Sequence, residues 1–352
     1  MKIKRNNGKI DVAVLGATGV VGQVFLHMLS HHKWFELSMI TGSEVRANKT
    51  YCNEVRWVLP EPIPEPVKDI KLDKIDINLL KEKGIRIVFS ALPADIARSV
   101  EPELRENGIY VFSNASAMRY ESHVPILIPE VNPGALENIK QQGFPTKGFV
   151  VTNANCSTTG LAVVLAPLKT FGIKEMFVST YQSVSGAGYP GLPAMDIMGN
   201  TIPYIQKEEE KMKVELKKIL QLDAAVYPHC VRIPVLFGHL ETVWIHIEKP
   251  VEKEDILETW RSFKFQGSQC PTLPEQPVVY MDDERFPQPK MSFWGLPAGM
   301  QVFTGRLRKE EDKIGFTLLV NNLVRGAAGG SIANAEFFIS RQEREGREEK
   351  KV

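Results

Sequence analysis

The feature that most restricts the fold lies near the start of the chain, where three glycines separate a strand-like run from a helix-like run. Residues 10–15 (IDVAVL) have a buried-strand pattern, and residues 23–29 (QVFLHML) have helical character. Between them, Gly16, Gly19 and Gly22 follow a Gly-x-x-Gly-x-x-Gly pattern. Such glycines let the backbone turn tightly and approach a pyrophosphate at the helix N-terminus. Placed between a strand and a helix, they predict a dinucleotide-binding α/β unit rather than a turn without a ligand.

Strand-like and helix-like runs alternate as far as about residue 153. Inner-strand patterns occupy residues 35–40, 85–92 and 109–112, while residues 51–76 are rich in proline and charge and are expected to form an excursion with short strands. This alternation predicts a parallel, doubly wound sheet that binds its cofactor at the carboxyl ends of the strands. The predicted cofactor contacts in this half of the chain are Gly16, Thr18, Gly19, Val20, Val21, Gly22, Ser43, Arg46 and Ser90.

The segment after the second strand bears on which dinucleotide is bound. An NAD-binding unit commonly places Asp or Glu there, against the ribose 2′-hydroxyl. This chain carries Ser43, Arg46 and Lys49, which are donors and cations suited to a 2′-phosphate. Glu44 is the one residue that could act as the NAD-type acid. The segment therefore favours NADP and leaves NAD open.

A second junction of strand and helix carries the candidate nucleophile. An apolar run, residues 149–152, is followed by small polar residues and then by residues 160–166, which suit a buried helix. Cys156 therefore lies about where the helix begins, and backbone N–H groups and the helix dipole favour the reactive thiolate there. The same N–H groups can hold the oxyanion that forms when a thiolate attacks a carbonyl. The alternative is a buried structural cysteine, which is the usual state of this residue.

Beyond this junction the pattern changes to longer, alternating strands. Residues 173–184 alternate as an antiparallel strand does, and so do residues 240–248. Gly238 would let His239 turn off the start of the second of these strands. Histidine carries protons near neutral pH, so His239 is a candidate acid or base, with a structural histidine as the alternative. Residues 322–338 are predicted to form a closing helix.

Composition and charge exclude several classes of function. The chain has 43 Lys and Arg against 42 Asp and Glu, so its net charge of +1 gives no strong field towards nucleic acid or anionic lipid. Its four cysteines are dispersed, which fits a reducing compartment and suggests no metal site. No run of about 18 apolar residues and no signal core is present. We therefore expect a cytoplasmic enzyme with no metal, nucleic acid or membrane partner.

Six stretches together resemble the aspartate-semialdehyde dehydrogenases, in their archaeal and fungal branch. They keep their order and span almost the whole chain, at residues 16–22 (GATGVVG), 113–119 (SNASAMR), 155–159 (NCSTT), 182–188 (QSVSGAG), 232–239 (RIPVLFGH) and 321–330 (NNLVRGAAGG). The resemblance implies a Rossmann-type α/β domain, residues 1–153, completed by a C-terminal helix, residues 322–352. It also implies an α+β catalytic and dimerisation domain, residues 154–321, with a mainly antiparallel sheet like that of glyceraldehyde-3-phosphate dehydrogenase.

The resemblance further implies an activity and its residues. The activity is the NADP-dependent reductive dephosphorylation of L-4-aspartyl phosphate to L-aspartate 4-semialdehyde, in the pathway to lysine through diaminopimelate, threonine, methionine and isoleucine. Cys156 would be the nucleophile that forms a thioacyl enzyme, His239 the general acid and base, and Gln182 the residue that orients the acyl group. The enzyme would be a homodimer or homotetramer acting on a small molecule.

Substrate and cofactor residues follow from the same resemblance. Arg232 would pair with the substrate α-carboxylate, and Glu208 would meet its ammonium group. Arg119 and Lys211 would form the phosphate site. The cofactor contacts implied in this way are Ser43 at the 2′-phosphate, Ser185 and Gly186 in the flexible turn, and Asn322 beside the nicotinamide.

Two other functions stay open. Residues 50–66 and the run Tyr189-Pro190-Gly191 also resemble an archaeal malonyl-CoA reductase of the same fold, which lacks the Asn-Cys-Ser-Thr-Thr run and therefore ranks second. The other is a catalytically inactive binding or regulatory protein, against which the intact Cys156, Arg232 and His239 argue. Related phosphorylating aldehyde dehydrogenases would not need Glu208 and Arg232 together.

Overall fold

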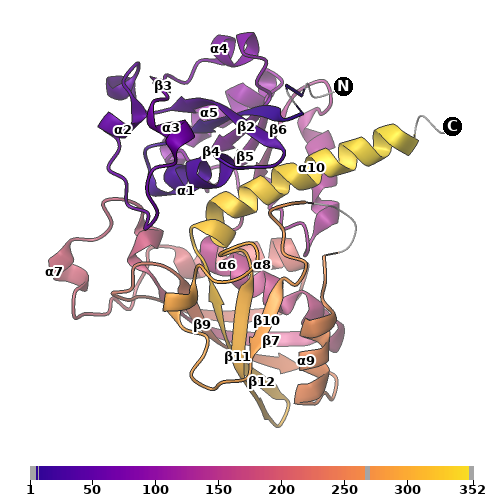
Figure 1. The fold of residues 1–352 in the computed structure, drawn as a ribbon. Coiled ribbons are helices and arrows are strands. Elements are labelled where there is room, and N and C mark those ends of the chain that lie inside the picture. The colour runs from indigo at the N-terminus through magenta and orange to yellow at the C-terminus, as the bar shows by residue number, and fades with distance from the viewer. Residues whose placement is uncertain (1–4, 7, 266–269, 349–352) are drawn as a thin grey trace. The chain divides into compact units, whose positions relative to one another are not determined.

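The chain forms two compact units in the computed structural model, which describes residues 5–6, 8–265 and 270–348 (Figure 1). The N-terminal unit combines Met1–Leu127, Gly134–Asn153 and Ser331–Val352. The C-terminal unit combines Ile128–Pro133 and Ala154–Gly330. Each unit has its own six-stranded sheet. In the described part of the chain, we find no helix with the length and apolar character needed to span a membrane.

The N-terminal sheet is parallel throughout, in the order β3-β2-β1-β4-β5-β6. Its strands are β1 (Ile10–Leu15), β2 (Phe35–Thr41), β3 (Leu72–Asp73), β4 (Ile87–Ser90), β5 (Tyr110–Ser113) and β6 (Phe149–Thr152). Every residue of β4, β5 and β6 is buried, as expected for a parallel sheet covered on both faces. The strand order reverses between β1 and β4, which confirms the predicted doubly wound sheet and sets its switch point.

Helices of the N-terminal unit connect these strands. They are α1 (Val20–Leu29), α2 (Tyr51–Glu54), α3 (Glu65–Lys68), α4 (Ile77–Glu82) and α5 (Ala94–Glu106), with the 3-10 helices η1 (Glu44–Arg46) and η2 (Pro133–Gln142). The expectation of short strands over residues 51–76 is largely wrong, because only β3 is a strand there and α2 and α3 are helical. Alternate positions from Pro60 to Pro66 are proline, which removes the N–H groups that a strand ladder needs.

The last helix, α10 (Gly329–Glu348), contributes to the core of the N-terminal unit from residue 331 onward. The ring of Phe338 lies 4.8 Å from that of Phe149 and 5.3 Å from that of Tyr110, measured between centroids. Phe112 and Phe144 complete this aromatic cluster. Offset and edge-to-face contacts of this kind stabilise a core beyond the area that they bury.

The C-terminal sheet is mixed and mainly antiparallel, as predicted, in the order β10-β11-β12-β9-β7-β8. Its strands are β7 (Ile173–Gln182), β8 (Ala225–Arg232), β9 (His239–Ile247), β10 (Val278–Met281), β11 (Val302–Glu310) and β12 (Lys313–Val320). Only the pairs β7–β8 and β10–β11 are parallel. Alternate residues of β9, starting with His239, are buried, so one face of the sheet is covered.

Helices of the C-terminal unit are α6 (Cys156–Leu165), α7 (Ala194–Ile197), α8 (Glu208–Leu220) and α9 (Lys253–Ser262), with the 3-10 helices η3 (Pro167–Phe171), η4 (Val184–Ala187) and η5 (Pro289–Met291) and the π-helix η6 (Val324–Ala328). The predicted closing helix over residues 322–338 is therefore interrupted, because η6 precedes α10. The Asn321 side chain accepts the N–H groups of Leu323 and Val324, at the start of η6.

Candidate active site

Cys156 is the first residue of α6, at the junction that the sequence singles out. Asn155 caps this helix, because its Oδ1 accepts the backbone N–H groups of Ser157 at 3.0 Å and Thr158 at 3.3 Å. The Cys156 side chain is half-buried. The thiol therefore lies in the positive field of a capped helix end, with access for a reactant.

His239 faces the thiol, with its Nε2 3.1 Å from Cys156 Sγ. The backbone N–H of Ser183 donates to His239 Nδ1 at 3.1 Å, so Nδ1 is an acceptor. The ring proton of neutral His239 is then on Nε2, directed at the sulfur. Complete burial, together with the charge of Arg232, lowers the pKa of His239 to about 3. At neutral pH the His239 imidazole is therefore uncharged, and its Nε2–H donates towards Cys156 Sγ.

Arg232 joins this group through the same peptide. It ends β8 in register with Gln182 of β7, and its Nη1 donates to the Ser183 carbonyl at 2.7 Å. Burial lowers the pKa of the guanidinium. Residues 233–238 cross from β8, on one flank of β7, to β9 on the other. This crossover brings Arg232 and His239 to one side of the sheet, although they are seven positions apart.

Gln182 is buried at the end of β7 and is directed at the first turn of α6. Its Nε2 donates to Ser157 Oγ and to Thr180 Oγ1, both at 3.3 Å. The structure thus brings Gln182 to the residue that follows the candidate nucleophile.

Asn322, predicted as a nicotinamide contact, is a hub of hydrogen bonds within the C-terminal unit. Its Oδ1 accepts the N–H of Gly238 at 2.9 Å and the hydroxyl of Ser183 at 3.2 Å. Its Nδ2 donates to Ser185 Oγ at 2.9 Å. These bonds hold both backbone segments that border His239. Local sequence patterns do not reveal this supporting role.

Glu208 and Lys211 lie in the first turn of α8, where Glu208 is buried. Glu208 Oε2 is 3.3 Å from Lys211 Nζ, and Glu208 Oε1 accepts the side-chain amide of Asn155. This face of α8 is therefore buried, although the helix carries many charged residues. The structure brings both predicted substrate residues next to the cap of the nucleophile's helix.

The π-helix η6 lies directly against Cys156 through Gly326. A Cβ atom added to Gly326 would lie 2.8 Å from Cys156 Cβ and 2.9 Å from its Cα, closer than real Cβ atoms approach. In η6 a buried ion pair, 2.8 Å between Arg325 Nη2 and Glu130 Oε1, joins this helix to the segment Ile128–Pro133. Sequence patterns do not predict a π-helix, a feature often found at functional sites.

We expect Gly326→Ala to lower kcat by roughly 10- to 100-fold, because the added methyl group has to displace the nucleophile by a fraction of an ångström or more. Steady-state kinetics test this result. The matched control is Gly346→Ala on α10, where an added Cβ meets nothing within 4 Å. Wild-type kcat in the Gly326 variant would show that the close approach has no effect on the thiol.

In the N-terminal unit, the glycine loop fits a dinucleotide phosphate. Gly16 has a φ of +77°, and a Cβ on it would lie 2.7 Å from the Ala91 carbonyl oxygen. A Cβ on Gly22 would lie 2.3 Å from the Gly16 carbonyl oxygen, so helix α1 packs closely on the loop. Gly19 caps α1 with no side chain in the way. Thr18, Val20 and Val21 complete the loop and the first turn of α1, whose N–H groups are the expected phosphate ligands.

Two buried residues that the sequence analysis missed hold this loop. Gln23 donates to the Thr18 carbonyl at 3.2 Å and to the Arg56 carbonyl at 2.9 Å. The Tyr51 hydroxyl donates to the Ala17 carbonyl at 3.0 Å, and burial raises the Tyr51 pKa. The sequence offered two signals for these residues. Gln23 is a polar residue within an apolar helix pattern, and Tyr51 is an aromatic residue within a charged segment.

The predicted 2′-phosphate residues follow β2 directly. Ser43 is exposed and precedes η1, in which Arg46 is the last residue. Glu44 lies exposed in the same short helix. The Ala17 N–H donates to the Thr41 carbonyl at 2.9 Å, so the end of β2 lies beside the glycine loop.

Ser90 and Arg119 belong to a buried polar group in the N-terminal unit. Ser90 ends β4 opposite Ser113, whose hydroxyl donates to Glu101 at 2.5 Å. Arg119 is buried, with its Nη2 donating to the Asn114 carbonyl at 3.2 Å. Burial raises the pKa of Glu101 to about 7, against the opposing hydrogen bonds and the Arg119 charge. Glu101 was not among the residues predicted from the sequence.

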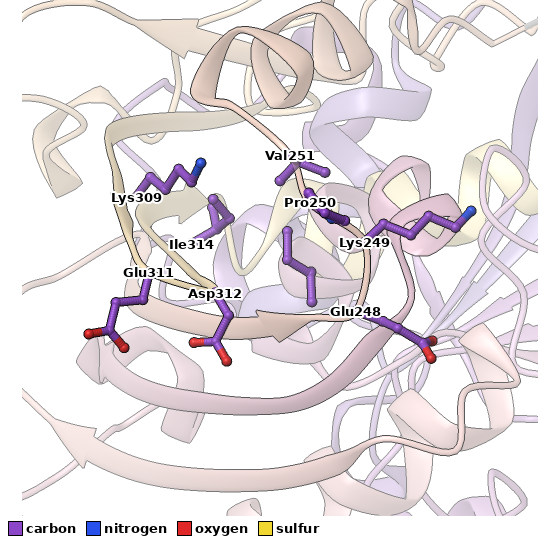
Figure 2. Close-up of a pocket in the computed structure, with 9 residues that line it drawn as sticks. Glu248, Lys249, Pro250, Val251, Lys309, Glu311, Asp312 and Ile314 are labelled. Atoms are coloured by element: carbon purple, nitrogen blue, oxygen red, sulfur yellow. The ribbon is translucent and has the colours of Figure 1, made fainter.

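A pocket of about 240 Å³ lies at the end of β9 remote from His239 (Figure 2). It is lined by Ile247, Glu248, Lys249, Pro250, Val251, Lys309, Glu311, Asp312 and Ile314. Ile247 ends β9, eight residues after His239, which is roughly 26 Å along a strand. This pocket therefore lies apart from the Cys156–His239 pair. Among the described residues, no group of three or more His, Cys, Asp or Glu side chains suits a metal ion.

Comparison with known proteins places this geometry in a family. A family model described as the NAD binding domain of semialdehyde dehydrogenase matches residues 11–139, and one described as the dimerisation domain matches residues 165–325. The aspartate-semialdehyde dehydrogenase of Methanothermobacter thermautotrophicus is 42% identical over 346 residues, covering 94% of this chain and 99% of that protein. A crystal structure of aspartate-semialdehyde dehydrogenase with NADP, from Candida albicans, matches with a TM-score of 0.84 at 32% identity, covering 94% and 99% of the two chains.

The doubly wound unit and the mixed-sheet unit with its cysteine–histidine pair match the two domains of the semialdehyde dehydrogenases, and this match places the chain in that class. The chain belongs to the aspartate-semialdehyde dehydrogenase family. The malonyl-CoA reductase (NADP) of Metallosphaera sedula is 32% identical over 354 residues, covering 94% of this chain and 97% of that protein. That relative is thus less similar, in line with its second rank in the sequence analysis.

Proposed function

We propose that the chain interconverts L-4-aspartyl phosphate and L-aspartate 4-semialdehyde with NADP, in the aspartate pathway of amino-acid biosynthesis. The observation that carries this proposal is the 3.1 Å pair of Cys156 Sγ and His239 Nε2 at the N-terminus of α6. In the reductive direction, the thiolate attacks the acyl carbon, phosphate leaves, and a thioester forms on Cys156. A bound dinucleotide would supply the hydride that reduces this thioester. The carbon–sulfur bond then breaks, which releases the aldehyde and restores the thiolate.

His239 and the N-terminal end of α6 both stabilise the negative charge that the reaction carries. The His239 Nε2–H stabilises the thiolate and then the oxyanion on the acyl carbon, because it already points at the sulfur. Backbone N–H groups at the start of α6 provide further donors. Gln182, held against Ser157, orients the acyl group. These roles are supported by the distances, and mutants test them.

Substrate recognition is assigned to four charged residues. Arg232 provides a planar donor for the α-carboxylate, and Glu208 is the acceptor for the ammonium group. Lys211 and Arg119 are the cations for phosphate. Arg119, Glu208 and Arg232 are buried. Buried charges are expected where a substrate carries the opposite charges, because each group is then paired on binding.

Cofactor choice is assigned to the segment after β2. Ser43 and Arg46 are proposed to contact the 2′-phosphate, and Ser185, Gly186 and Asn322 to border the nicotinamide half. The relative from Candida albicans was solved with NADP, which supports the same choice here.

Arg46→Ala is expected to reduce the preference for NADP over NAD by roughly 10- to 100-fold, because one charge-assisted hydrogen bond of about 1.5–3 kcal/mol is lost. The ratio of kcat/KM for the two cofactors measures this change. Arg98→Ala is a matched control, because Arg98 is an exposed arginine of α5 and not part of the segment after β2. Equal use of both cofactors by the wild type would instead assign Glu44 to the ribose.

We also propose that the N-terminal unit binds the dinucleotide, and that the C-terminal unit carries catalysis and self-association as a homodimer or homotetramer. The two family descriptions, NAD binding over residues 11–139 and dimerisation over residues 165–325, support this division. The cytoplasmic location stays a prediction from the cysteine content. Sedimentation analysis of the purified protein distinguishes the two assemblies.

One spectrophotometric assay tests the activity. Aspartate semialdehyde, phosphate and NADP are expected to give cofactor reduction that depends on phosphate, while malonyl-CoA with NADPH gives little oxidation. The reverse pattern would assign the chain to the malonyl-CoA reductases. No turnover with either pair, combined with intact dinucleotide binding, would favour an inactive regulatory homologue.

A further inference from the structure

Asn155, the residue before the nucleophile, is held by two carboxylates of α8. Its backbone N–H donates to Glu215 Oε2 at 2.5 Å, across a separation of 60 residues. Its side-chain amide donates to Glu208 Oε1. Glu208 and Glu215 are seven positions apart, so they lie on the same face of α8, two turns from each other. Glu215 is fully buried.

The side-chain oxygen of Asn155 is bonded to α6 rather than to α8. Its Oδ1 accepts the N–H groups of Ser157 and Thr158 and the Ser157 hydroxyl at 2.7 Å. The backbone N–H, the side-chain amide and the side-chain carbonyl of Asn155 are therefore all hydrogen-bonded. Because Cys156 is the next residue, any shift of Asn155 moves the thiol and the helix cap together.

The two carboxylates differ in what else they can contact. Glu208 is already shared between Asn155 and Lys211 Nζ, and it is the residue assigned to the substrate ammonium. A substrate ammonium would thus compete for the oxygen atoms that Asn155 uses. Glu215 lies deeper, two turns further along α8 and closed off from solvent, so its bond to the Asn155 backbone is not exposed to that competition.

We propose that Glu215 is a positioning residue that fixes the Asn155–Cys156 peptide, so that the nucleophile keeps its place while Glu208 exchanges Asn155 for the substrate ammonium. The exchange at Glu208 rests on the proposed function, whereas the positioning of Cys156 by Glu215 does not. A displacement of about 1 Å in a catalytic group costs roughly a hundredfold in rate, which is the scale of the effect to be prevented.

The test compares Glu215→Leu, Glu215→Gln and Glu208→Gln in the full-length protein. The first readout is the rate constant for alkylation of Cys156 by iodoacetamide, followed on its peptide by mass spectrometry. The second is the split between kcat and KM with aspartate semialdehyde. Glu210→Gln is the matched control, because Glu210 is exposed on the same helix. An unfolded chain is alkylated as well, so the folded fraction of each variant is measured separately by circular dichroism.

Glu215→Leu leaves the Asn155 N–H without its acceptor, so we expect alkylation about tenfold slower and kcat lower by roughly 10- to 100-fold, with KM within about threefold. Glu215→Gln keeps an acceptor oxygen and is expected to recover most of the alkylation rate. Glu208→Gln is expected to raise KM for the amino-acid substrate by about tenfold or more, with the smaller effect on alkylation.

An alkylation rate in Glu215→Leu equal to that of Glu210→Gln would overturn the proposal. If the leucine variant does not fold, Glu215→Asp replaces it, because the shorter carboxylate cannot keep the 2.5 Å contact and is also expected to slow alkylation. If the wild type does not turn over aspartate semialdehyde but Glu215→Leu still slows the alkylation of Cys156, the positioning role is retained and the proposed function is rejected. The two failures are therefore distinguishable.

Discussion

Cys156→Ser is expected to lower phosphorylating turnover by at least about three orders of magnitude, while dinucleotide affinity stays near that of the wild type. A serine alkoxide is far harder to form at neutral pH than a thiolate. His239 cannot compensate by deprotonating the serine. Its Nδ1 already accepts the Ser183 N–H, and burial keeps the ring neutral. Steady-state rates and cofactor titration by fluorescence measure the two quantities.

A control for this variant is Cys52→Ser, since Cys52 is a half-buried cysteine in α2 of the N-terminal unit. It is expected to turn over at the wild-type rate. Substantial turnover by the Cys156 variant would falsify the assignment of the nucleophile. A loss of dinucleotide binding in the same variant would point instead to a disturbed fold.

His239→Asn is expected to lower kcat by roughly 10²- to 10⁴-fold and to change KM much less, as for a residue that acts at the reacting centre. Asparagine can still accept the Ser183 N–H, so the supporting bond is retained while the donor aimed at Cys156 Sγ is lost. Unchanged kcat would reduce His239 to a structural histidine. Kinetics at saturating substrate measure the effect directly.

The same variant has a pH signature in stability. Burial lowers the folded pKa of His239 to about 3, whereas an unfolded histidine titrates near pH 6.5. The unfolded chain therefore binds the extra proton first as the pH falls, and stability declines between about pH 6.5 and pH 3. His239→Asn removes that component. The urea unfolding free energy of both proteins, measured across this range, is expected to show the shallower slope in the variant.

Local signals in the sequence accounted for the glycine loop and for the start of α6. A Cβ added to Gly16 or Gly22 would clash with nearby backbone atoms, so only glycine fits at these positions. The glycine spacing therefore predicts the loop. Cys156 follows a helix cap, and the cap residue Asn155 is itself in the motif. Alternation along residues 173–184 and 240–248 correctly indicated β7 and β9, because one face of each strand is buried.

Contacts between distant residues could not be predicted from such patterns. The Ser183 peptide joins His239 and Arg232 only because β8 and β9 flank β7, which is a property of the strand order. Glu215 lies in a strongly charged stretch of sequence, and only the fold of α8 shows that it contacts Asn155. The π-helix was not predicted, because the sequence shows no local signal for it; the hydrogen bonds that Asn321 Oδ1 accepts at its start also occur in ordinary turns.

Three separate stretches of chain build the N-terminal unit, and the third, from Ser331 onward, is made after the entire C-terminal unit. Phe338 is therefore synthesised long after Phe112 and Phe149, the aromatic residues that it packs against. The His32–Glu336 pair, 2.7 Å apart and buried, closes at the same late moment. The core of the N-terminal unit is therefore complete only when this last stretch of the chain has been made.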